Sequence, residues 1–114
     1  MLTYALLLFL IAAVGGLFLA SFVLRGRFAP WVVSLLHMLL GASGLGLLAT
    51  AVVTSGVATL PLIALCVLTT AALLGIYLAS LHFREKVARK KLVLTHAGVA
   101  VAGVSVLIAA ILLP

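Results

Sequence analysis

Two histidines of this chain stand in matching surroundings. His37 lies in SLLHMLLGASG and His96 in VLTHAGVAVAG, and a glycine follows each of them seven residues later. Both stretches are strongly apolar, and an imidazole within a membrane is costly unless it faces the interior of a helix bundle. Two imidazoles that face each other across a bundle can ligate a haem from both sides. We therefore predict that His37 and His96 are the axial ligands of one haem b.

Small and cationic residues accompany both histidines. Residues three or four positions apart share one face of a helix, so small residues deeper along each histidine face could line a macrocycle. These lining candidates are Gly41, Gly44, Ala100 and Gly103, with Gly16 and Gly75 from the preceding helices. Haem propionates would need cations, and arginine suits carboxylates. The candidates for this role are Arg25, Arg27, Arg84 and Lys86.

Other interpretations of the same residues stay open. Small residues at four-residue spacing also let membrane helices pack closely, and the histidines would then be structural. The chain would in that case be a non-catalytic accessory subunit of a larger membrane complex, or one partner of a homo-oligomer. A third possibility is a site for a quinone or another lipid-soluble ligand, with the histidines as hydrogen-bond donors. A zinc site is less favoured, because zinc usually takes four ligands.

Hydrolytic chemistry is not expected. The only acidic residue is Glu85, which stands among basic residues. A proton-coupled multidrug exporter would need a carboxylate within the membrane, and a catalytic triad would need an acid beside its histidine. Cys66 and the third histidine, His82, are expected to be a packing residue and an interfacial residue. A redox carrier therefore fits the sequence better than a classical enzyme.

Composition indicates the elements that must position the histidines. The chain has 114 residues, of which 68% are hydrophobic, and its mean hydropathy is +1.56. About 20 apolar residues suffice to cross a bilayer as a helix. Four such runs occur, at about 2–24, 31–54, 60–81 and 92–113. The fold class predicted is an all-α integral membrane protein, a single domain over 1–114 with an up-down bundle of four transmembrane helices.

The charged residues predict the orientation of this bundle. All seven Lys and Arg residues lie in 25–27 or 84–91, the first and third connections between the predicted helices. Positive residues favour the cytoplasmic side, so both termini are predicted to face outward. The predicted setting is a bacterial inner membrane. We expect the cations to report topology rather than nucleic-acid binding, because no basic domain stands outside the apolar runs.

The two halves of the chain match without a gap when one is shifted by fifty-nine residues. In the first half the matching residues are Ala12, Ala13, Gly16, Leu19, Ala20, Ser21, Arg25, Leu35, His37, Gly44, Leu48 and Ala51. We interpret this as a tandem duplication of a helical hairpin, with repeats at 1–55 and 60–114. Each repeat crosses the membrane twice, so the copies should be parallel and related by a pseudo-two-fold axis along the membrane normal. The histidines would then lie at equal depth, about 9 Å from the cytoplasmic end at 1.5 Å per residue.

Overall fold

The structure is a computed structural model that describes residues 1–113, and its regular elements are helices. They are α1 (Leu2–Val23), α2 (Trp31–Thr54), α3 (Thr59–Phe83) and α4 (Lys90–Leu112). Each of these four helices is long and apolar enough to cross a membrane. The prediction of an all-helical chain with four helices of this kind is thereby confirmed.

The helix bounds differ from the predicted ones by at most two residues. α2 has the predicted bounds, α1 ends one residue early, and α3 runs on to Phe83. α4 begins at Lys90, whereas its apolar run begins at 92. Hydropathy marks the apolar run and not the helix itself. Lysine is a good helix former, and its long stem can lie along apolar surface while the ammonium stays in water.

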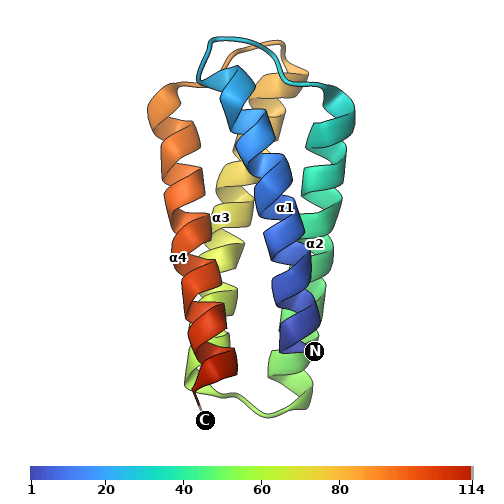
Figure 1. Cartoon of the computed structure of the whole chain (residues 1–114), viewed down its shortest axis with the longest axis vertical. Helices are drawn as coiled ribbons and strands as arrows, with labels where there is room; N and C mark the ends of the chain where they lie inside the picture. Colours follow the sequence, from blue (N-terminus) through green and yellow to red (C-terminus); the bar gives the residue numbers. More distant parts are fainter. Residues whose placement is uncertain (114) are drawn as a thin grey trace.

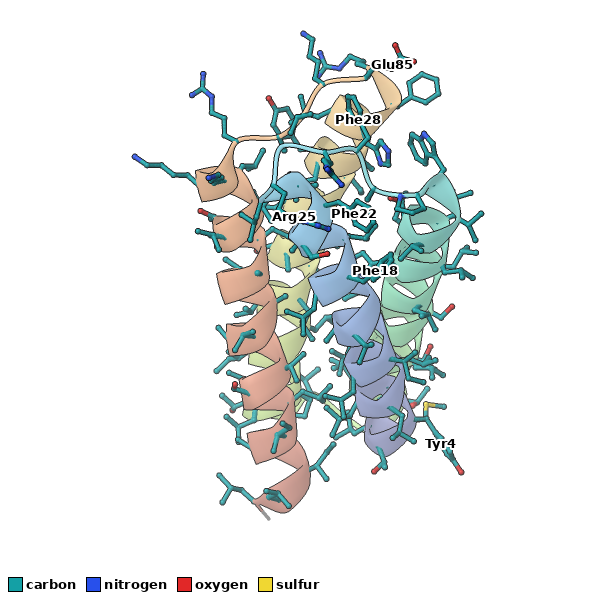
Figure 2. The ribbon with its side chains drawn as sticks, turned by 45° about the horizontal axis from the view of Figure 1, so that its top comes forward. Tyr4, Phe18, Phe22, Arg25, Phe28 and Glu85 are labelled. Carbon is teal, nitrogen blue, oxygen red and sulfur yellow. The ribbon has the colours of Figure 1, made fainter. Side chains whose placement is uncertain are left out.

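The connections that carry charged residues lie at one end of the bundle, and the uncharged connection lies at the other end (Figure 1). Residues 24–30 and 84–89 lie at one end of the bundle, which we call the basic end, and residues 55–58 lie at the other end with both termini. Figure 2 places Arg25, Phe28 and Glu85 at the basic end and Tyr4 at the opposite one. The basic residues therefore gather at one end of the apolar helices.

α1 and α3 end in the same kind of turn. Gly26 and Glu85 both have positive φ angles, of 72° and 58°. The next amide in each case donates to a carbonyl five residues back: Arg27 N to Phe22 O and Lys86 N to Leu81 O, both at 2.9 Å. This is the Schellman pattern, in which glycine is favoured at the left-handed residue. Glu85 adopts that conformation without being glycine, which costs conformational energy.

The helices pack as two hairpins, α1 with α2 and α3 with α4, and the two hairpins touch each other less extensively. Each helix also contacts one helix of the other hairpin, α2 with α3 and α1 with α4. The buried core repeats at the fifty-nine-residue spacing, with the pairs Ala5 and Ala64, Phe9 and Leu68, and Leu48 and Leu107. Large apolar side chains cover much of the outer surface. Such a surface is expected where lipid, not water, surrounds the helices.

Candidate functional site

His37 on α2 and His96 on α4 meet inside the bundle. Their ring centroids lie 6.2 Å apart, and the ring planes are nearly perpendicular, at 80°. Both side chains are half-buried. α2 and α4 stand diagonally across the bundle, since each contacts α1 and α3 but not the other within the described residues. The two imidazoles therefore approach each other across the bundle interior.

Each imidazole is held by a backbone carbonyl of its own hairpin. His37 Nδ1 lies 2.8 Å from Ala12 O, and His96 Nδ1 lies 2.8 Å from Ala71 O. A carbonyl oxygen can only accept, so Nδ1 must carry the proton in both rings. In the neutral imidazole, Nε2 then keeps its lone pair and can bind a metal or accept a hydrogen bond.

Gly16 and Gly75 make this approach possible. A Cβ atom added at Gly16 would lie 3.0 Å from Cε1 of His37, and one at Gly75 would lie 3.0 Å from Cε1 of His96. Each glycine follows the accepting alanine by four residues, so its bare surface lies beside the carbonyl. These two predicted site residues therefore lie directly against the imidazoles.

The predicted lining residues of α2 and α4 have other neighbours. A Cβ at Gly44 would meet the ring of Phe9 at 2.9 Å, and one at Gly103 would meet Leu68 Cγ at 2.6 Å. Both are buried and admit a large side chain from the adjacent helix of the same hairpin. A Cβ at Gly41 would meet nothing within 4 Å, and Ala100 is half-buried. The structure thus gives Gly44 and Gly103 a role in helix packing.

A cavity of about 90 Å³ runs from the histidine site toward the basic end. Its lining includes His37 and Gly75 at one extreme and Arg27 and Lys86 at the other. Two of the predicted cations therefore lie where an anionic group of a bound ligand would reach them.

The other two predicted cations are turned toward their own helices. Arg25 Nε donates to Ser21 O at 2.7 Å, and Arg84 Nε donates to Ser80 O at 3.3 Å. Cations near a helix C-terminus interact favourably with its last carbonyls. Arg25 and Arg84 therefore cap α1 and α3.

One polar contact at the basic end was not predicted from the sequence. Ser34 is buried at 8% exposure, and its Oγ lies 3.2 Å from Nδ1 of His82. Trp31 and Phe28 lie parallel to the His82 ring, with centroids 4.0 and 5.9 Å away. Ser34 precedes His37 by three residues and so shares its helix face, which is the one feature of the sequence that could have suggested it.

The described residues contain no group of three or more His, Cys, Asp or Glu side chains that could hold a metal ion. Cys66 is exposed on α3. Any metal at the histidine pair would thus need most of its ligands from a non-protein group, and a porphyrin supplies four nitrogens. No family model, curated protein or solved structure matches this chain.

Proposed function

We propose that this chain is a membrane protein that binds one haem b between His37 and His96 and carries electrons near the basic end. The observation that carries the proposal is the repeated arrangement in which Nδ1 donates to a helix carbonyl, so that Nε2 of the neutral ring keeps its lone pair. Histidines that bind metals almost always donate their other ring nitrogen to a carbonyl or carboxylate, which fixes the tautomer and raises the basicity of the ligating atom. Here both histidines have that support.

The spacing of the rings suits a shared metal. An imidazole nitrogen binds a metal at about 2 Å, so the centres of two axial imidazoles lie on the order of 6 Å apart. The observed separation of the ring centroids is 6.2 Å. Haem supplies reversible one-electron transfer when bound, and its potential depends on ligation, burial and nearby charge.

The surroundings of the pair also suit a flat, anionic cofactor. Gly16 and Gly75 leave the two remaining helices bare beside the rings, and Arg27 and Lys86 line the cavity that leads to the basic end. A macrocycle exceeds that cavity of about 90 Å³, so binding requires the two hairpins to move apart. The contacts between hairpins are sparser than those within them, which makes this the easiest direction of opening.

We further infer that the bundle is an up-down arrangement of two duplicated hairpins related by a pseudo-two-fold axis. Equivalent positions share their core burial, their hydrogen bonds to Ala12 O and Ala71 O, and their positive φ angles at Gly26 and Glu85. Such agreement over turns and polar contacts is not required of unrelated hairpins. It supports a common origin and an equivalent role for the two histidines.

The proposed setting is a bacterial inner membrane, with the basic connections in the cytoplasm and both termini outside. Support comes from the confinement of all seven Lys and Arg residues to the basic end. The test is a thiol placed by Ser55→Cys after replacing the single native cysteine by Cys66→Ala. An impermeant maleimide should label it from the outside of intact cells. If the thiol is labelled only after the cytoplasm is opened, the orientation of the bundle is opposite to the one proposed.

The absorption spectrum of the purified protein tests the haem proposal. The wild type, expressed with a supply of haem, should show the Soret band of a low-spin haem. His37→Ala and His96→Ala should each abolish the band or convert it to that of a weakly held, high-spin haem. Thr95→Ala is a matched control, because Thr95 is exposed and its hydroxyl donates only to Lys91 O of its own helix. A wild type without a Soret band would contradict the proposal and favour an accessory subunit.

A further inference from the structure

The contact between Ser34 and His82 has no counterpart in the other hairpin. Ser34 Oγ and His82 Nδ1 lie 3.2 Å apart, linking α2 to α3. The positions fifty-nine residues away from them hold Val93 and Val23, which can form no such bond. The polar pair thus exists once per chain, whereas the histidine pair deeper in the bundle uses both hairpins. A feature that departs from the repeat needs an explanation other than the packing that the hairpins share.

Aromatic rings hold the His82 imidazole in one plane. Trp31 lies 4.0 Å from it between ring centroids, and Phe28 lies 5.9 Å from it, both within 10° of parallel. With Nδ1 bound to Ser34, the ring can turn little about its own axis. The direction of its second nitrogen, Nε2, is therefore defined by the surrounding side chains.

This polar pair lines the cavity of about 90 Å³ described above. Apart from Arg27, His37 and Lys86, the rest of the wall is apolar. Two of these apolar side chains, Phe28 and Met38, are also exposed on the outer surface. A hydrophobic ligand could thus reach the polar pair from the lipid. The cavity of about 90 Å³ is smaller than an engineered cavity of about 150 Å³ that binds benzene, so the surrounding side chains must move to admit a ring.

We propose that Ser34 and His82 bind the carbonyl end of a membrane quinone. If the hydroxyl of Ser34 donates to Nδ1 of His82, Nε2 carries the proton and donates to a quinone carbonyl. If Nδ1 donates to the Ser34 oxygen, Nε2 is an acceptor and receives the hydroxyl of a quinol. The pair therefore complements both redox forms by a change of tautomer, without movement of the ring.

The quinone proposal does not rest on the proposed haem, although the two ligands would share one cavity, because His37 and Gly75 line its deep extreme. His82 follows Gly75 by seven residues, which is about 10 Å along α3 at 1.5 Å per residue. The head group would therefore lie between the deep histidine pair and the basic connections. The ligand is therefore tested on the chain purified without haem.

Trp31 provides the measurement. It is the only tryptophan of the chain, and it stacks on His82. Decylubiquinone is added to the purified protein in nanodiscs, and its quenching of the Trp31 fluorescence is followed. We expect quenching that saturates. Ser34→Val and His82→Val, which install the residue type of the other hairpin, should each raise the half-saturating concentration about tenfold, as expected when one buried hydrogen bond is lost.

The control is Ser43→Val, which removes an exposed serine from the same helix and should leave the titration unchanged. Quenching that rises in proportion to total quinone, or saturation that neither variant alters, would overturn the proposal. If a variant fails to fold, the wild type decides alone. Decylubiquinone should raise its unfolding temperature while decanol, which has the tail without the head group, should not. Equal effects of both would also overturn it.

Discussion

The deep histidine pair and the Ser34–His82 pair differ in how they relate to the two hairpins. Around His37 and His96, each contact occurs twice: the carbonyl that accepts from Nδ1 and the glycine beside Cε1. Around His82, the serine partner and the stacked aromatic rings occur once. The contacts present in both hairpins are those on which the proposed duplication rests. The contacts present once lie in the wall of the cavity near the basic end, where Ser34 and His82 meet.

The shared packing glycines should give the largest effect on stability. Gly103→Ala would bring a Cβ to 2.6 Å from Leu68 Cγ, and Gly44→Ala to 2.9 Å from the Phe9 ring. Overpacking of this kind costs about 1–3 kcal/mol. We expect both variants to lower the free energy of unfolding in a detergent titration, with Gly103→Ala the worse.

Gly98→Ala is the control, because a Cβ there meets nothing within 4 Å. If Gly44→Ala and Gly103→Ala are as stable as Gly98→Ala, the two hairpins do not use these glycines for close packing. Their predicted role beside the macrocycle would then stand without a competing explanation.

Substitutions at the positive-φ residues of the turns that end α1 and α3 should change the free energy of unfolding in opposite directions. Gly26 and Glu85 share a positive φ, which costs an L-residue roughly 1–2 kcal/mol relative to glycine. Glu85→Gly should therefore raise the free energy of unfolding by about 1 kcal/mol, and Gly26→Ala should lower it by a similar amount. A loss of stability in Glu85→Gly would show that the two turns are not equivalent.

The glycines beside the imidazoles should give the smallest effect on stability and a visible one on the cofactor. In Gly16→Ala or Gly75→Ala, a Cβ at 3.0 Å from Cε1 would displace the ring by a few tenths of an ångström. Well below 1 kcal/mol of stability should be lost, since a small ring shift relieves the contact. The haem spectrum should change to a similar extent in both variants. A change in only one of them would break the proposed equivalence of the histidines.

Sequence patterns were sufficient for the four apolar helices. The apolar runs predicted the four helices to within two residues, because hydropathy and helix length are local properties. The fifty-nine-residue spacing also predicted that His37 and His96 share one environment, and the two Nδ1 contacts of 2.8 Å agree with it.

The sequence could not predict which neighbouring residue each small or charged residue contacts. A stripe of small residues fits a cofactor and a close helix contact equally well, and only the placement of Phe9 and Leu68 distinguishes them at Gly44 and Gly103. Arg25 and Arg27 stand two residues apart, yet one caps α1 and the other lines the cavity. The Ser34–His82 bond joins residues forty-eight positions apart, which no local pattern reports.

The haem content and spin state of the wild-type protein test the central claim most directly. Electron paramagnetic resonance of the oxidised protein distinguishes a low-spin ferric haem with two imidazole ligands from a high-spin haem with one. We expect one low-spin haem per chain in the wild type and none in the His37→Ala/His96→Ala double variant. An unchanged low-spin signal in the double variant would contradict the assignment of the ligands, and a wild-type chain without haem would contradict the function itself.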